Sequence, residues 1–176
     1  MRVMEKCARG SLLALTGNPS DAAQILTTGI AALRSAGATT WALAHLPWLV
    51  LAFAQLGKFD DAWHCISEAL SLIEDSNQRS VEAEVHRLAG EISLGSAMPD
   101  VKKAEEYFAY ALKIAREQQA NSWELRAAMS LARLWRDQGK VQQARELLAP
   151  VYGWFTEGFD TRDLKEAKAL LEELAS

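Results

Sequence analysis

The sequence of 176 residues contains little glycine and proline, 10 and 4 residues respectively, and almost no runs of β-branched residues. Alanine and leucine, which are strong helix formers, are abundant instead. These features argue against a β-rich or disordered chain and predict an all-α protein. The length is sufficient for a single domain, residues 1–176, with a sizeable core.

Cysteine is also scarce: Cys7 and Cys65 lie far apart and form no CxxC motif, so we expect two buried thiols in a reducing compartment. No stretch reaches the roughly 18 apolar residues of a membrane helix, and the N-terminus lacks a signal-peptide pattern. The net charge of -4 argues against a nucleic-acid-binding domain. We therefore expect a cytoplasmic protein with neither nucleic acid nor membrane as partner.

Motifs for catalysis and nucleotide binding are missing. The sequence has no GxxxxGK[ST], GxGxxG, HExxH or GxSxG pattern and no calcium loop. Of the three histidines, His45 and His86 could meet across neighbouring helices, but a metal needs at least a third ligand. Cys7 or Glu82 could supply it, whereas ordinary hydrogen bonding explains the histidines more simply. The sequence predicts no enzyme, no cofactor and no metal.

The sequence does contain an internal repeat. Shifting residues 41–66 by 82 positions places Trp41 on Trp123 and Gly57 on Gly139. A glycine that ends one helical stretch is followed by a small residue that begins the next helical stretch. These small residues recur every 40 to 42 positions, as Ala62, Ala104 and Ala144. Periods in this range are typical of stacked helix pairs, each of which covers the apolar face of its neighbour.

The apolar periodicity predicts four helix pairs and a C-terminal cap. The units are 1–36, 39–76, 79–118 and 121–158, and the cap helix is 161–175. The helices are expected near 2–16 and 20–35, 39–56 and 59–75, 79–95 and 101–118, and 121–138 and 141–157. The cap is amphipathic, as the end of a repeat array requires, and Thr161 or Asp160 begins it.

The repeat resembles tetratricopeptide repeats, abbreviated TPR. The turn glycine, the alanine five residues later and the bulky residue four further on follow that family's pattern, and Leu131-Ala132 stands where the family has Leu-Gly. The segment from Ala104 to Leu174 further resembles the C-terminal end of large bacterial signalling ATPases that carry an adenylate-cyclase-like or winged-helix module. The specific part is Pro150–Thr161. The resemblance implies a TPR-like right-handed superhelix whose first helix in each pair lines a concave surface.

On that assumption, each first helix presents one inward stripe. The four stripes are Met4, Cys7, Ser11 and Ala14; Ala44, Pro47, Leu51 and Ala54; Ala83, His86, Gly90 and Ser93; and Arg126, Met129, Arg133 and Arg136. The last stripe is basic and has no acidic residue one turn away along its own helix. It is either a solvated surface or a site for carboxylates or phosphates, which arginine binds with two parallel hydrogen bonds.

Two further positions carry alternatives. Pro47 either tunes the curvature of the array or frees a backbone carbonyl that binds a ligand together with His45. Most of the six tryptophans are expected in the core, with Trp154 packed beneath the cap helix.

The favoured interpretation is a non-catalytic protein-interaction scaffold or docking domain in bacterial signalling. The alternative is a small-ligand sensor with its effector in the concave groove. The predicted partner-binding residues are Arg126, Met129, Arg133, Arg136, His86, His45, Pro47 and Leu51. The partner is a protein or peptide, with an acidic one as an option. The uncovered N-terminal edge, with Val3, Leu12 and Leu13, suggests a homodimer.

Overall fold

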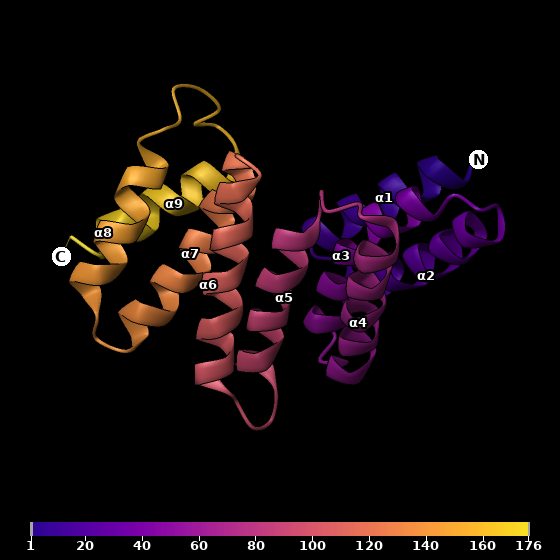
Figure 1. The fold of residues 1–176 in the computed structure, drawn as a ribbon, viewed down its shortest axis with the longest axis horizontal. Coiled ribbons are helices and arrows are strands. Elements are labelled where there is room, and N and C mark those ends of the chain that lie inside the picture. The colour runs from indigo at the N-terminus through magenta and orange to yellow at the C-terminus, as the bar shows by residue number, and fades with distance from the viewer. Residues whose placement is uncertain (1, 176) are drawn as a thin grey trace.

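The computed structural model describes residues 2–175, and this part of the chain contains helices and turns but no strand. Four antiparallel pairs follow one another along a curved array, and a ninth helix closes the C-terminal end (Figure 1). The pairs are α1 (Val3–Leu15) with α2 (Pro19–Ser35), α3 (Thr39–Gln55) with α4 (Phe59–Ser76), α5 (Glu82–Gly95) with α6 (Val101–Glu117), and α7 (Asn121–Asp137) with α8 (Val141–Tyr152). The single helix is α9 (Arg162–Glu173).

The first helices of successive pairs stack on one another. Helix α1 packs against α3, α3 against α5, α5 against α7, and α7 against α9, while each second helix also packs against the first helix of the next pair. The small residues at the start of the second helices, Ala62, Ala104 and Ala144, are completely buried. They allow the close approach between helices that the repeat pattern predicted, and the all-α, TPR-like architecture is confirmed.

A single turn geometry joins most of the helices. The middle residue of each three-residue turn has a positive φ, as in Gly17 (85°), Gly57 (70°) and Gly139 (78°). The next residue donates its N–H back to a carbonyl five residues earlier, for example Lys140 to Trp135 at 2.8 Å. This pattern is a helix-ending Schellman motif, in which glycine avoids the strain of the left-handed conformation. Gln119 adopts the same conformation, with φ 53°, but lacks that freedom.

Helix boundaries differ from the sequence prediction in two places. Helix α5 begins at Glu82 rather than near residue 79, because Asn77 takes a left-handed conformation and a five-residue connection follows α4. Helix α8 ends at Tyr152, five residues before the expected end, where Gly153 follows it. Trp154 therefore lies in the connection to α9 and is 69% exposed, so its expected packing beneath the cap helix is wrong.

The cap helix α9 is amphipathic, as expected, but its buried stripe differs by one residue. Leu164, Ala167, Leu170 and Leu174 are buried against the last pair, whereas Leu171, expected in the stripe in place of Leu170, is only partly buried. Thr161 is the residue before its first turn and has an extended backbone, although its hydroxyl donates to the Gly158 carbonyl instead of capping the helix. No helix in the described part is both long and apolar enough to cross a membrane.

Candidate functional site

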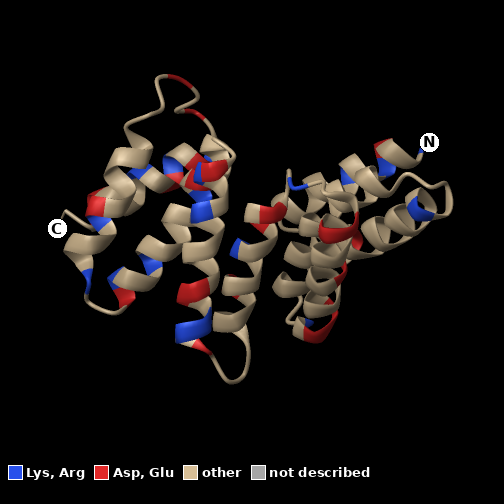
Figure 2. Cartoon of the chain, in the orientation of Figure 1, with Lys and Arg blue, Asp and Glu red and all other residues tan. Residues whose placement is uncertain are grey.

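A pocket of about 270 Å³ lies where the stacked first helices meet the cap helix. We call it the A-helix pocket. It is lined by Leu15 at the end of α1, by Leu51, Ala54 and Gln55 of α3, by Arg87, Leu88, Glu91 and Ile92 of α5, by Arg126, Met129, Ser130 and Arg133 of α7, and by Arg162, Asp163 and Glu166 of α9. Helix α3 contains no Lys, Arg, Asp or Glu, the residues that Figure 2 colours blue and red, so the wall that it gives to the pocket is uncharged.

Four of the predicted partner-binding residues meet in this pocket: Leu51, Arg126, Met129 and Arg133. They come from α3 and α7, and both of these helices pack against α5. Arg136 lies one turn further along α7 and does not line the pocket. The stacking of the first helices thus places Leu51 in the same pocket as Arg126, which lies 75 positions later in the sequence.

The arginines of α7 are paired with acidic side chains, contrary to the free basic stripe that the sequence suggested. Arg126 lies 2.8 Å from Glu84 and 3.5 Å from Asp163. Arg133 and Arg136 bond to two further carboxylates of α9, at 3.0 Å and 2.6 Å respectively. On α7 itself only Asp137 pairs with one of these arginines, at 2.9 Å from Arg136. The other carboxylates come from α5 and α9, which are separate elements of the chain.

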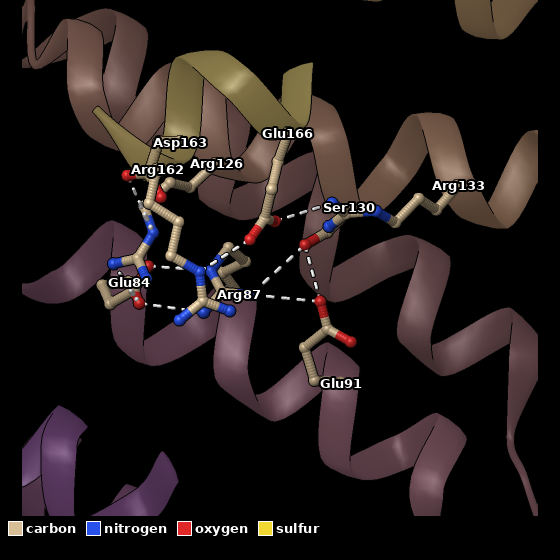
Figure 3. A network of polar contacts seen from close by, with 9 residues as sticks. All are labelled: Glu84, Arg87, Glu91, Arg126, Ser130, Arg133, Arg162, Asp163 and Glu166. Atoms are coloured by element: carbon tan, nitrogen blue, oxygen red, sulfur yellow. Dashed lines mark hydrogen bonds and ion pairs between the residues drawn. The ribbon is translucent and has the colours of Figure 1, made fainter. Parts of the chain in front are cut away.

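The centre of the network is Arg87, which is buried together with Glu84 (Figure 3). Arg87 bonds to both carboxylate oxygens of Glu84, at 2.8 and 2.9 Å, and reaches Glu91 at 3.1 Å and the Ser130 hydroxyl at 3.3 Å. Ser130 in turn donates to Glu91 at 2.7 Å. Burial alone would lower the pKa of Arg87, but the adjacent carboxylates outweigh it and raise that pKa. The guanidinium therefore stays charged.

Arg162 links the two ends of the array across the pocket. Its Nε donates to Glu166 at 2.7 Å and its Nη1 to the backbone carbonyl of Leu15 at 3.2 Å, which connects α9 to the end of α1. Glu166 is thereby held between Arg162 and Arg133. Burial alone would raise the pKa of Glu166, and the hydrogen bonds from the two arginines outweigh that effect and lower it.

The predicted stripe of α5 is displaced by one residue. His86 faces α6, where its ring meets Tyr110 edge-on at 4.6 Å, and Gly90 packs against the ring of Phe108. The side of α5 that faces the pocket carries Arg87 and Glu91 instead. The predicted inward position of His86 is therefore wrong. Burial lowers the pKa of His86, and its Nδ1 is buried without a hydrogen-bond partner in the described structure.

His45 and Pro47 also lie outside the A-helix pocket. His45 Nδ1 is 3.1 Å from the hydroxyl of Ser11 on α1, and burial lowers its pKa. Pro47 is buried within α3. Among residues 2–175 no cluster of three or more His, Cys, Asp or Glu side chains is arranged to hold a metal. The residues missed by the sequence prediction are Glu84, Arg87, Glu91 and Ser130, together with Arg162, Asp163 and Glu166.

Comparison with known proteins gives the fold but no closer kinship. No family model matches the chain, and no curated protein matches it. A solved structure from Podospora anserina, the nearly identical TPR-like repeats of a candidate kinesin light chain, superposes with a TM-score of 0.66 at 16% sequence identity. The match covers 97% of this chain and 83% of that one. A single-substitution variant of the same fungal protein gives a TM-score of 0.64 at 16% identity, over 97% and 92% of the two chains. The chain thus has the fold of TPR-like helical repeats.

Proposed function

We propose that the chain is a non-catalytic protein-interaction module that docks a segment of a partner protein in the A-helix pocket. The observation that carries the proposal is the composition of this pocket: an uncharged wall from α3 faces a rim of arginines and carboxylates on the inner helices of a repeat array. Repeat scaffolds of this kind commonly offer such extended surfaces to partners. The contact residues that we propose are Leu51, Met129, Arg126 and Arg133, with Arg136 beside them.

The setting we propose is bacterial signalling in the cytoplasm. The support is the resemblance of Ala104–Leu174 to the C-terminal end of bacterial signalling ATPases. The ion pairs of α7 change the partner that we expect. Each arginine of α7 already holds a carboxylate, so a purely acidic segment gains less binding energy from these arginines than it would gain from unpaired ones. A segment with an apolar side chain beside charged ones matches the pocket better.

A quantitative pull-down tests the docking proposal. Leu51→Glu places a carboxylate on the uncharged wall, and Arg133→Glu reverses a charge on the rim, so both should lose the partners that the wild type captures. Arg145→Glu on α8 is the matched control, since Arg145 is exposed and forms no ion pair in the described structure. Arg116, on α6, is a poorer control because it bonds to the buried Glu124 at 2.8 Å. Equal capture by all four proteins, at equal melting temperatures, would contradict the proposal.

Homodimerisation through α1 is a second partner proposal. Val3 and Leu12 are exposed at this end, 36% and 58% respectively, whereas Leu13 is half-buried against the core. Sedimentation equilibrium of the wild type and of Leu12→Lys tests it. We expect a concentration-dependent dimer that the substitution weakens, and a monomer at all concentrations would refute it.

The alternative function is a small-ligand sensor. One observation favours it: the A-helix pocket combines both signs of charge with an apolar wall in a volume of about 270 Å³. This volume is slightly below the roughly 300–1,000 Å³ of pockets that bind drug-sized ligands. Native mass spectrometry after mild purification should then show a bound small molecule. Its loss on Arg133→Glu and its retention on Arg145→Glu would support this alternative.

A further inference from the structure

The charges that line the A-helix pocket are almost balanced. Four arginines, Arg87, Arg126, Arg133 and Arg162, face three carboxylates, Glu91, Asp163 and Glu166, which leaves a surplus of one positive charge. The buried Glu84, bonded to Arg87 and Arg126, offsets that surplus from behind the lining. A divalent anion such as a phosphate would add negative charge beside these carboxylates. A ligand that carries one positive and one negative group matches the lining better, because each of its groups finds the opposite sign on a wall.

We infer that the A-helix pocket binds a small zwitterion, an α-amino acid with an aliphatic side chain. This inference rests on the alternative function, the small-ligand sensor, and gives the chemical class of its ligand. The carboxylate would bind the arginines of the rim, the ammonium the carboxylates, and the side chain the wall from α3.

Donors for a carboxylate remain on Arg133 and Arg162. Arg133 uses Nη2 for Glu166, so its Nε and Nη1 have no partner in residues 2–175. Arg162 uses Nε and Nη1 for Glu166 and the Leu15 carbonyl, so its Nη2 is equally unoccupied within the described chain. Glu166, held between these two arginines, demonstrates that a carboxylate fits there at 2.7–3.0 Å. Arginine offers several donors in a rigid fork, so each can serve a second carboxylate.

Acceptors for an ammonium remain on Glu91 and Asp163. Glu91 accepts from Arg87 and Ser130 through Oε1 alone, and its Oε2 has no partner in the part of the chain described. Asp163 is engaged through Oδ2, at 3.5 Å from Arg126. Ser130, which bonds Glu91 at 2.7 Å, precedes Arg133 by three residues on α7. Ser130 thus connects Glu91 to the face of α7 that carries Arg133 about one helical turn later. The ammonium and the carboxylate of an α-amino acid are attached to the same carbon, and a hydrogen bond at each end lets the ligand reach groups on both sides.

The apolar wall specifies the side chain. Leu51 and Ala54 of α3 line the pocket, Met129 of α7 lines it as well, and none of them carries a polar group that a ligand would have to satisfy. The cavity of about 270 Å³ leaves space for a branched aliphatic side chain. A side chain with its own charge would disturb the near balance of the lining.

Isothermal titration calorimetry with four probes tests the inference. L-Leucine has all three features. 3-Methylbutylamine lacks the carboxylate, 4-methylpentanoate lacks the ammonium, and glycine lacks the side chain. We expect saturable binding of leucine to the whole chain and at least tenfold weaker binding of each of the other three. Equal binding of leucine and 4-methylpentanoate would overturn the inference and indicate a simple anion site.

Matched variants locate the binding. Arg133→Gln and Glu91→Gln each remove one charge from the pocket, and each should weaken leucine binding at least tenfold. Arg145→Gln and Glu157→Gln make the same charge changes at exposed positions outside it and should leave binding unchanged. Circular dichroism melts check that all four variants fold.

Two results would refute the zwitterion: no binding of any aliphatic amino acid at millimolar concentration, or unchanged binding in both pocket variants. Native mass spectrometry separates this failure from that of the sensor function. A different molecule that co-purifies with the wild type and is lost from Arg133→Gln would refute the amino acid and keep the sensor. An empty pocket in both experiments would refute both.

Discussion

Glu84→Gln tests whether the buried ion-pair network holds the inner helices together. Glu84 is only 3% exposed and bonds two arginines, Arg87 at 2.8 and 2.9 Å and Arg126 at 2.8 Å. Glutamine keeps the size but removes the charge, and one of its two polar atoms is a donor that must face a guanidinium. Loss of one partner from a buried pair costs about 3–5 kcal/mol, because the remaining charge is left uncompensated.

That cost is a large fraction of the roughly 5–15 kcal/mol by which domains are usually stable. At roughly 2–4 °C per kcal/mol for a chain of this size, the melting temperature should fall by about 6–20 °C. Urea unfolding followed by circular dichroism measures the free energy directly. Glu117→Gln is the control: Glu117 is about half exposed, with Arg79 at 4.0 Å and Lys113 at 3.8 Å, so less than about 1 kcal/mol is expected. A loss below about 1 kcal/mol for Glu84→Gln would refute the reasoning.

Three other predictions concern stability, each measured by chemical or thermal unfolding. Gly90→Ala should cost about 1–3 kcal/mol, because the new Cβ would overlap a ring carbon of the buried Phe108; a neutral effect would contradict the packing. Gln119→Gly should stabilise by about 0.5–1 kcal/mol by removing left-handed strain, and a loss would contradict this. Burial lowers the pKa of His86 below its value in the unfolded chain, so the unfolded chain binds a proton more readily than the folded one. The free energy of unfolding should therefore fall as the pH drops below about 6.5. His86→Gln should flatten that pH dependence, and an identical pH profile in the variant would contradict the reasoning.

Most of the fold could be predicted because it depends on local periodicity. The turn glycines, the small residues of the second helices and the amphipathic cap are signals that a single helix pair already contains. Gly57 and Gly139 have the positive φ that the repeat required, and Ala62 and Ala144 are buried as expected. Gln119 shows the limit, since the same turn forms there without its glycine, and the geometry of the flanking helices decides the conformation.

The candidate site was only partly predictable because its charges pair across the array. On α5, the spacing of three and four residues placed Ala83, His86, Gly90 and Ser93 on the stripe expected to face the concave surface. The structure instead buries Glu84 and Arg87, which satisfy each other. The acidic and basic residues at positions 84, 87 and 91, spaced at three and four, were a usable signal for one helical face. Nothing in the sequence, however, indicated that Arg126 would complete the network from another repeat unit.

The magnitudes show which contacts hold the cap helix in place. Leu164, Leu170 and Leu174 are each buried to about 96% or 97%, and burial of a leucine side chain contributes roughly 1.5–3 kcal/mol. The pairs Arg133–Glu166 and Arg136–Glu173 have side chains that are 36–58% exposed, and such pairs contribute roughly 0–1 kcal/mol. The leucines therefore hold α9 on the array. Close packing of these leucines also resists small shifts of α9 along its axis, whereas the long, partly exposed side chains of the ion pairs adapt to them. The leucines thus position the cap helix so that its carboxylates face the arginines of α7, and the pocket has its balanced charge as a consequence of that alignment.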